Sequence, residues 1–357
     1  MPRERARSFA PGRVNLIGEH TDYNLGLALP FAIAEGVSVS AVAAGSQAAE
    51  RVRVHALDLG EWDEFELCDP SPAPGWRAFA RGTAAELARA GFPLVGGQLE
   101  IEGALPRGAG LSSSAALEVA LCIALLELGS SDRSWQRGDF DRLEIARLCS
   151  RVENDWVGAR TGLLDQISSI FGEPDRALRI DFLTLEIDPV PLALDGWRLV
   201  LVGSGEPHTH ASSGYNERRA ECARACELLG VASLRQATPE SVQLLPVPLS
   251  LRASHVLGEN ARVRATVAAL RAGDLPAVGT LLSASHESER DLFEVSTPAV
   301  EAAVQRLLGA GAAGARLVGG GFGGSVLGLF APGVDPPPGA REVRPGPGAR
   351  ALEGPDS

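Results

Sequence analysis

The sequence predicts an α+β protein of two domains, and three observations support this prediction. Its 357 residues, 45% of them hydrophobic, suffice for two cores rather than one. The first half mixes β-rich and helical segments, whereas helical periodicity dominates the second half. A Gly-Glu-Pro-Asp turn follows a predicted helix near residues 173–176. We therefore expect an N-terminal domain at residues 1–176 and a C-terminal domain at residues 177–335.

Apolar periodicity identifies the elements of the first half in chain order. β-Branched or alternating runs predict strands at residues 36–44, 51–56 and 98–105. Apolar residues at helical spacing predict helices at residues 76–90, 112–128 and 140–157. Short apolar runs predict two further strands at residues 178–182 and 197–202.

The second half reads as mainly helical until its final part. The predicted helices occupy residues 215–229, 251–272, 275–293 and 299–308. A last predicted strand at residues 315–318 enters the glycine-rich run at residues 319–324. From Pro332 onward, Pro-Gly clusters replace the periodic pattern.

All 33 basic residues of the chain are arginine, and none is lysine. The absence of lysine excludes a Walker-A phosphate loop, a protein kinase and Schiff-base chemistry, because each requires a lysine side chain. A net charge of −12 argues against a nucleic acid or an anionic membrane as partner. The five cysteines are odd in number and scattered, and the N-terminus has no apolar signal segment, so we expect a cytoplasmic protein.

The segment at residues 11–24 is rich in hydrogen-bonding side chains around one short apolar run. Carboxylates can accept hydrogen bonds from sugar hydroxyls, and arginine and histidine can donate them, so this loop suits a polyhydroxylated ligand. The alternative interpretation is a solvated turn that follows a strand. The polar side chains are Arg13, Asn15, Glu19, His20, Thr21, Asp22 and Asn24.

A second segment, at residues 106–116, brings Gly108 and Gly110 directly before a helix that opens with serines. Glycines let the backbone approach an anion, and a helix start offers free N–H groups and a positive dipole end. The segment could therefore hold phosphate without lysine. The alternative is an ordinary serine-capped helix.

The glycines at residues 319–324 formally match Gly-x-Gly-x-x-Gly, but no βαβ unit surrounds them, so we reject a dinucleotide site. Two acidic residues on predicted helices, Glu153 and Asp165, are also candidates, although such acids are usually solvated. Asp165 lies between Leu164 and Ile167, and a carboxylate in that setting requires a partner, for which an arginine is suited.

Together these segments resemble the galactokinases, a branch of the GHMP kinase superfamily. Residues 11–24 resemble the galactokinase signature, residues 106–116 the phosphate-binding motif and residues 315–324 the third, glycine-rich motif. The resemblance extends from about Ser8 to Phe330. It implies the two-domain GHMP kinase fold, with the active site between the domains and the C-terminal segment 340–352 joined to the N-terminal domain.

The resemblance also implies a role for individual residues. Arg13 and Asp165 match the catalytic pair. The positions that match sugar contacts are Glu19, His20, Asp22, Gly162, Asp165 and Tyr215. The positions that match ATP contacts are Gly108, Gly110, Ser112 and Ser113, with Trp76 near the adenine. Ser114 and Glu153 match the ligands of Mg²⁺.

The expected reaction is phosphorylation of D-galactose by ATP at the anomeric hydroxyl, with Mg²⁺ as cofactor. Phosphoryl transfer depends mainly on positioning and on neutralising charge. An aspartate held by an arginine is a weak base, so we expect Asp165 mainly to orient the hydroxyl while Arg13 supplies positive charge. Whether Asp165 also accepts the proton stays open. We expect the enzyme to be a monomer.

Two alternatives share these motifs. One is a kinase for galacturonate, arabinose or N-acetylgalactosamine, and the other is a galactose and ATP sensor without catalytic activity. The chain also departs from the family pattern at three places. Leu25 replaces a usual glycine, His208 and His210 lie in an unusually glycine-rich stretch, and the usual helix after Phe330 is missing.

Overall fold

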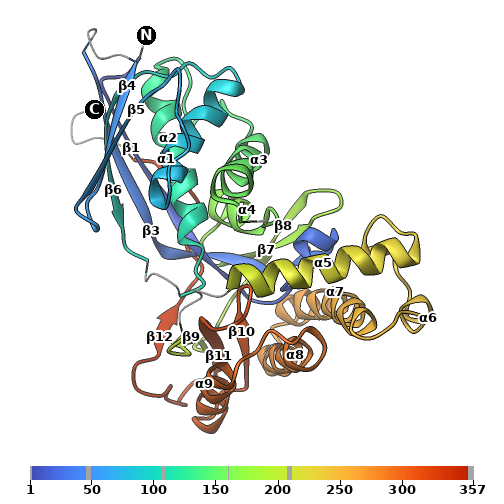
Figure 1. Ribbon diagram of the computed structural model, residues 1–357. Helices are drawn as coiled ribbons and strands as arrows, with labels where there is room; N and C mark the ends of the chain where they lie inside the picture. Colours follow the sequence, from blue (N-terminus) through green and yellow to red (C-terminus); the bar gives the residue numbers. More distant parts are fainter. Residues whose placement is uncertain (1, 46–49, 106–108, 160, 207–210, 353–357) are drawn as a thin grey trace.

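The computed structural model describes residues 2–45, 50–105, 109–159, 161–206 and 211–352, without the side chains of residues 211–213. These residues form three sheets and two groups of helices, one group in each half of the chain (Figure 1). Strands and helices are mixed as an α+β arrangement, which confirms the predicted class. Near the end of the described chain, residues 350–351 pair with the first strand and so return to the half in which the chain begins.

The largest sheet of the described residues has six strands and belongs to the N-terminal half. Its strand order is β13-β1-β3-β6-β4-β5, and β4 and β6 form its parallel pair. The strands are β1 (Arg5–Asn15), β3 (Pro30–Ala43), β4 (Arg51–Ala56), β5 (Glu61–Glu66), β6 (Gly97–Gly103) and β13 (Arg350–Ala351).

Strand β1 changes character along its length. Exposed and buried side chains alternate at its start, but every residue from Ala10 to Asn15 is buried. The pairing of β1 with β3 shifts register between Pro11 and Arg13, and the Arg13 N–H donates to the Leu111 carbonyl at 3.1 Å. Such irregularities redirect side chains near functional sites. Arg13 therefore lies on the buried end of a strand, not in the loop that the sequence suggested.

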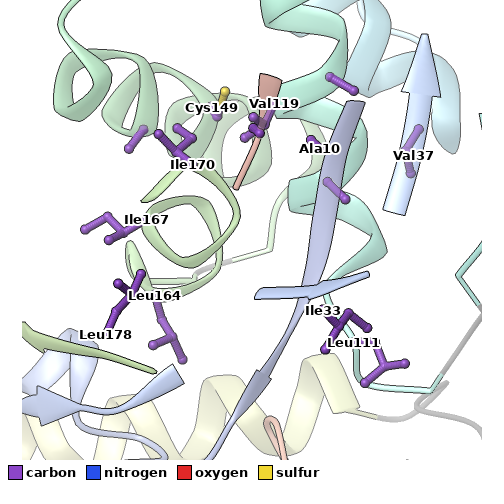
Figure 2. Packing of buried hydrophobic residues seen from close by; sticks show 14 of the residues in the cluster. Ala10, Ile33, Val37, Leu111, Val119, Cys149, Leu164, Ile167, Ile170 and Leu178 are labelled. Carbon is purple, nitrogen blue, oxygen red and sulfur yellow. The ribbon is translucent and has the colours of Figure 1, made fainter. Parts of the chain in front are cut away.

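One face of this sheet is covered by the N-terminal helices (Figure 1). Helix α2 packs against β1 and β3 and is buried around almost its whole circumference, as expected of a helix that is apolar on all sides. Figure 2 shows Val119 of α2 in one apolar layer with Ala10 of β1 and Ile170 of α4. The helices of this group are α1 (Trp76–Arg89), α2 (Ser113–Gly129), α3 (Arg142–Arg151), the π-helix η3 (Val152–Val157) and α4 (Leu164–Phe171).

A short sheet lies where the two halves meet. It consists of β2 (Leu27–Ala28), β7 (Arg176–Asp181) and β8 (Glu186–Pro191), in the order β2-β7-β8. Strand β2 follows residues 16–26, which we call the β1–β2 loop, and its pairing with β7 anchors the end of this loop. The loop is therefore held at both ends by strands.

The C-terminal half combines an antiparallel sheet with helices. The sheet order is β10-β11-β9-β12, formed by β9 (Arg198–Gly203), β10 (Gly314–Val318), β11 (Ser325–Phe330) and β12 (Arg341–Val343). Two 3-10 turns, η1 (Asp22–Asn24) and η5 (Leu234–Gln236), lie in the β1–β2 loop and in this half. Its helices are α5 (Ala211–Leu229), α6 (Pro239–Val242), α7 (Leu249–Arg271), α8 (Leu275–Ser288), the π-helix η6 (Glu289–Phe293) and α9 (Pro298–Gly309).

The C-terminal tail belongs to both halves in turn. Strand β12 pairs with β9 of the C-terminal sheet, whereas β13 pairs with β1, and Trp135 Nε1 donates to the Ala349 carbonyl at 2.9 Å. The tail thus crosses from one half to the other after Val343. Within segment 340–352, which was expected to join the N-terminal domain, β13 does so, whereas β12 pairs with the C-terminal sheet. The division into residues 1–176 and 177–335 stays a prediction.

Several predicted elements differ from those observed. The helix predicted at residues 140–157 ends as a π-helix from Val152, and the one at residues 275–293 does so from Glu289. The strand at residues 315–318 is not the last, because β11, β12 and β13 follow it. Between Phe330 and Arg341 the described chain forms no helix, as its Pro-Gly composition predicted.

Candidate active site

A cleft of about 440 Å³ lies between the two halves and is lined by residues of both. Its size is typical of a pocket for a small molecule. The N-terminal half supplies Arg13, Gly110, Ser112 and Asp165 among others, and the C-terminal half supplies Tyr215, Asn216, Gly319 and Gly320. Most of the residues that the sequence suggested therefore lie around one cavity.

Arg13 and Asp165 meet at the centre of the cleft. The Arg13 Nη2 atom is 2.9 Å from Asp165 Oδ1, and Arg13 Nη1 donates to the Gly110 carbonyl at 2.6 Å. Ser112 Oγ donates to the other carboxylate oxygen of Asp165. The arginine partner that the setting of Asp165 predicted is thus Arg13. Its Nε atom is buried and has no partner among the described residues.

The β1–β2 loop brings a group of polar side chains to one end of the cleft. Glu19 Oε1 accepts a hydrogen bond from the Gly319 N–H at 2.7 Å, across the two halves. His20 Nδ1 is 2.8 Å from the Tyr23 hydroxyl, and the His20 ring packs against Tyr215 and Phe293. Thr21 Oγ1 donates to the carbonyls of Gly18 and Leu27, which closes the loop. These contacts fix the loop without a ligand.

Burial sets the protonation of this group. It raises the pKa of Asp22 to about 6, with further increases from the charges of Asp165 and Glu19. Burial also raises the pKa of Glu19 and lowers the pKa of His20 well below its usual value. Histidine at this position is therefore neutral at neutral pH, and the carboxylates supply hydrogen-bond acceptors.

Two glycines allow backbone and side chains to approach closely in the cleft. A Cβ atom on Gly162 would lie 2.0 Å from Asp22 Oδ2, and one on Gly320 would lie 2.9 Å from the Tyr215 ring. Any larger residue would displace these groups. Gly162 was expected at this site, whereas Gly320 was not singled out.

The turn that follows Asp22 contains the unusual Leu25. Leu25 adopts a left-handed conformation with φ of 54°, which is strained for a residue other than glycine. Arg235 of the C-terminal half donates to the Leu25 carbonyl at 3.1 Å and forms two hydrogen bonds with Asp181, at 2.8 and 2.7 Å. Arg235 thereby connects the turn to Asp181 of β7, and its bidentate ion pair fixes the direction of the guanidinium.

A second polar cluster lies beside the start of α2. Ser114 Oγ donates to Glu153 Oε1 at 2.8 Å, and Glu153 Oε2 accepts from Thr161 Oγ1 at 2.8 Å and Gln166 Nε2 at 2.9 Å. Burial raises the pKa of Glu153 and that of Glu118 more strongly. Gln166 lies between these two carboxyl groups, because its Nε2 also contacts Glu118 Oε2 at 3.3 Å.

A hydroxyl and one carboxylate together suit Mg²⁺, which commonly takes one or two carboxylates and completes its shell with water and substrate phosphates. No group of three or more His, Cys, Asp or Glu side chains able to hold a metal ion occurs among the described residues. Ser114 and Glu153 therefore fit a metal that arrives with a phosphate ligand rather than a closed protein site.

The start of α2 also lines the cleft. Gly110 and Ser112 have positive φ values of 72° and 56°, which turn the chain sharply into the helix that begins at Ser113. The free N–H groups of this first turn can bind an anion. Gly108, which was expected here, lies outside the described residues, as do His208 and His210.

Trp76 does not line the cleft in the structure. Its Nε1 donates to Glu61 Oε2 at 2.9 Å on the outer side of α1. Phe79, nearly one helical turn further along, lines the cleft instead, together with Val157. The sequence contained this signal, since Phe79 lies in the same aromatic segment, but the helix orientation decided which ring faces inward.

Three family profiles match this chain. The profile described as the galactokinase galactose-binding signature matches residues 2–43, the GHMP kinases N terminal domain matches residues 78–173, and the GHMP kinases C terminal domain matches residues 266–344. The expected order of motifs therefore corresponds to matched segments in both halves.

Similar proteins cover most of the chain. A galactokinase of Thermotoga petrophila is 41% identical over 89% of this chain and 87% of its own length. A galactokinase of Mycobacterium tuberculosis is 42% identical over 90% of this chain and 87% of its own length. The crystal structure of a Lactococcus lactis galactokinase complexed with galactose matches with a TM-score of 0.89 and 31% identity, covering 98% of this chain and 96% of that one. The two-domain GHMP kinase fold is thereby confirmed.

We predict that Glu118→Gln stabilises the protein more at pH 8 than at pH 5. Burial holds the pKa of Glu118 well above its usual value, so its contribution to stability is present at low pH and is lost as pH rises through that raised pKa. Glutamine keeps the shape and the contact with Gln166 without a charge. Each unit by which folding raises the pKa corresponds to about 1.4 kcal/mol of unfolding free energy, so the difference between the two pH values should be measurable in thermal unfolding.

The matched control is Glu102→Gln, which removes an exposed carboxylate from β6. It should change the unfolding temperature little and equally at both pH values. If Glu118→Gln also shifts stability equally at pH 5 and pH 8, Glu118 is not protonated in the folded protein.

Proposed function

This chain belongs to the galactokinase family of the GHMP kinases, and we propose that its cleft transfers the terminal phosphoryl group of ATP to the anomeric hydroxyl of D-galactose. The products are galactose 1-phosphate and ADP. The observation that carries this proposal is the position of the Arg13–Asp165 pair. The pair lies in one cleft with the polar β1–β2 loop and the anion-binding start of α2.

The sugar is proposed to occupy the end of the cleft formed by the β1–β2 loop. Glu19 and Asp22 provide acceptors for its hydroxyl groups, and the neighbouring His20, Gly162 and Tyr215 complete the wall. Glycine at residue 162 permits this arrangement, because the Asp22 carboxylate occupies the space that a side chain at residue 162 would fill. The triphosphate is proposed to bind at Gly110, Ser112 and Ser113, at the start of α2, with Phe79 nearby.

Arg13 and Asp165 are proposed to act together on the reacting groups. Both carboxylate oxygens of Asp165 already accept hydrogen bonds, from Arg13 and Ser112, which fixes the direction in which the remaining lone pairs point. A fixed carboxylate can orient the attacking hydroxyl, and the adjacent guanidinium can stabilise charge on the transferred phosphoryl group. A loose transition state requires little early removal of the proton.

Ser114 and Glu153 are proposed to hold Mg²⁺ together with phosphate oxygens of ATP. The hydrogen bonds from Thr161 and Gln166 keep Glu153 oriented toward this place. When bound, the ion would neutralise charge on the phosphates.

The charge of the cleft favours a neutral sugar over a sugar acid. Its described lining contains four carboxylates, those of Glu19, Asp22, Glu153 and Asp165, whereas Arg13 is its one described arginine and is paired with Asp165. A galacturonate carboxylate would therefore meet like charges among these described residues. The intact arrangement of Arg13, Asp165 and the serines of α2 also favours turnover over a sensor without catalysis.

We further propose that the enzyme works as a monomer in the cytoplasm. Both halves of one chain contribute described residues to the cleft, and the roles proposed above use residues of that one chain. No helix of the described residues is long and apolar enough to cross a membrane.

The first test is a panel of sugars assayed by ADP release with ATP and Mg²⁺. Galactose should give the highest kcat/KM, and galacturonate the lowest, because of the carboxylates around the sugar end of the cleft. Arabinose and N-acetylgalactosamine complete the panel. A higher kcat/KM with any of these three would assign the enzyme to that sugar, and galactose binding without ADP release would show a sensor.

We predict that Asp165→Ala removes most turnover but leaves ATP binding almost intact. The substitution removes the oriented carboxylate and leaves the start of α2, where ATP is proposed to bind. Turnover should fall by about a thousandfold or more, while the ATP dissociation constant from calorimetry stays within about twofold. Turnover within about tenfold of the unsubstituted enzyme would contradict the role of Asp165.

We also predict that kcat/KM for galactose falls as the pH decreases from 7 to 5. With a pKa of about 6, Asp22 changes from about nine-tenths ionised to about one-tenth over this range and loses acceptor capacity. Asp165 and Glu19 raise this pKa, whereas Arg219 lowers it. Asp22→Asn should bind galactose weakly and lose the change near pH 6. An unchanged pH profile in that variant would assign the effect to another group.

A further inference from the structure

Arg316 is a fully buried arginine of β10 that does not line the cleft. It nevertheless contacts the segment that carries the proposed sugar ligands. Its Nη1 atom donates to the carbonyls of Asn15 at 3.0 Å and Leu16 at 3.2 Å, where β1 ends and the β1–β2 loop begins. Arg316 thus connects β10 of the C-terminal half with the start of this loop.

The same guanidinium also lies against two buried carboxylates. Arg316 Nη2 donates to Glu289 Oε1 at 2.8 Å, and Arg316 Nη1 is 3.5 Å from Glu19 Oε1. Glu19 Oε1 also accepts the Gly319 N–H, three residues along the chain from Arg316. Residues 316–319 of the C-terminal half therefore contact both the backbone at the start of the loop and the Glu19 side chain.

The positive charge of Arg316 favours the ionised form of Glu19. Burial raises the pKa of Glu19 and raises that of Glu289 further, while the charge of Arg316 lowers both. Arg316 is therefore shared by two buried carboxyl groups, with Glu289 at hydrogen-bond distance and Glu19 at 3.5 Å. A buried carboxylate without such a partner is strongly unfavourable.

We propose that Arg316 is a positioning residue for the sugar, because it fixes the Glu19 carboxylate and the end of β1 in the orientation that the sugar requires. This inference rests on the proposed function of the cleft. It gives β10 and the glycine-rich run at residues 319–324 a role in sugar affinity, although Arg316 itself does not touch the sugar.

The geometry requires the planar fork of arginine. The two Nη atoms point to two carbonyls and two carboxylates that belong to different elements. The single ammonium group of lysine cannot occupy both Nη positions. Arg316→Lys therefore retains a positive charge but loses the simultaneous hold on the loop and on Glu289.

Arg252 of α7 provides a closely matched control. Its side chain is 1% exposed, and its Nε donates to Glu221 Oε2 at 2.7 Å. Its Nη1 donates to the Leu292 carbonyl at 2.6 Å, and its Nη2 pairs with Glu294. Arg252 is thus a buried arginine with two carboxylates and a carbonyl, but all of these partners belong to the C-terminal half.

The experiment compares Arg316→Lys with Arg252→Lys in the full-length enzyme. Galactose binding is measured by calorimetry, KM for galactose and for ATP by ADP release, and stability by thermal unfolding. Both variants should lose stability. Arg316→Lys should weaken galactose binding by about tenfold or more and leave KM for ATP within about twofold, whereas Arg252→Lys should change neither by more than about twofold.

A double-mutant cycle with Glu19→Gln tests whether Arg316 acts through Glu19. In the Glu19→Gln background, Arg316→Lys should add much less to the loss of galactose affinity than it does alone. If Arg316→Lys does not fold, the double variant Arg316→Lys/Glu289→Gln is used instead. It replaces the guanidinium and also removes the buried Glu289 carboxylate that would lose its partner. The same loss of galactose affinity is expected.

Two results would overturn the inference. One is unchanged galactose affinity in a folded but less stable Arg316→Lys protein, and the other is an equal loss for galactose and ATP. The unsubstituted enzyme is assayed first with the sugar panel. If it does not phosphorylate galactose, the proposed function fails, and the comparison of Arg316 with Arg252 is made with the sugar that is turned over.

Discussion

The ion pair between Arg13 and Asp165 is the interaction around which the cleft is arranged. It joins the buried end of β1 to the first turn of α4, and Ser112 attaches the start of α2 to the same carboxylate. The side chains of Arg13 and Asp165 are only 7% and 18% exposed, so each charge depends on the other. Removing one partner of a buried pair typically costs about 3–5 kcal/mol. Three elements that are distant in the sequence are thereby held at one point.

The two halves contribute differently to this cleft. The N-terminal half supplies the ion pair, the start of α2 and the Ser114–Glu153 group, all supported by the packed helix α2. The C-terminal half supplies Tyr215 and Gly319 to the wall and holds the β1–β2 loop through Arg235 and Arg316. The polar side chains of the β1–β2 loop therefore belong to the N-terminal half, whereas the arginines that hold the loop belong to the C-terminal half. The geometry of the loop thus depends on how the two halves meet.

The absence of lysine is consistent with the way this protein places positive charge. Arg13, Arg235 and Arg316 each contact a carboxylate and at least one backbone carbonyl. A planar guanidinium can satisfy such acceptors in fixed directions, whereas an ammonium group acts as a point charge. In our proposal, phosphate binding falls to the backbone N–H groups at the start of α2 and to Mg²⁺ at the Ser114–Glu153 group. None of the chemistry proposed for the cleft requires a lysine.

Composition and periodicity were enough to predict the α+β class, the polar loop, the glycine-serine helix start and the need of Asp165 for an arginine. These features are local, because composition and periodicity within one segment are sufficient to specify them. The resemblance suggested Arg13 as that partner, and the folded chain places the two side chains 2.9 Å apart. Only the tertiary structure decided that Phe79 rather than Trp76 lines the cleft and that Arg316 lies beside Glu19. The contacting residues are far apart in the chain, and Gly319 and Glu19 are separated by 300 positions. Which of them meet depends on strand register and on the packing of whole elements, and no single segment encodes either.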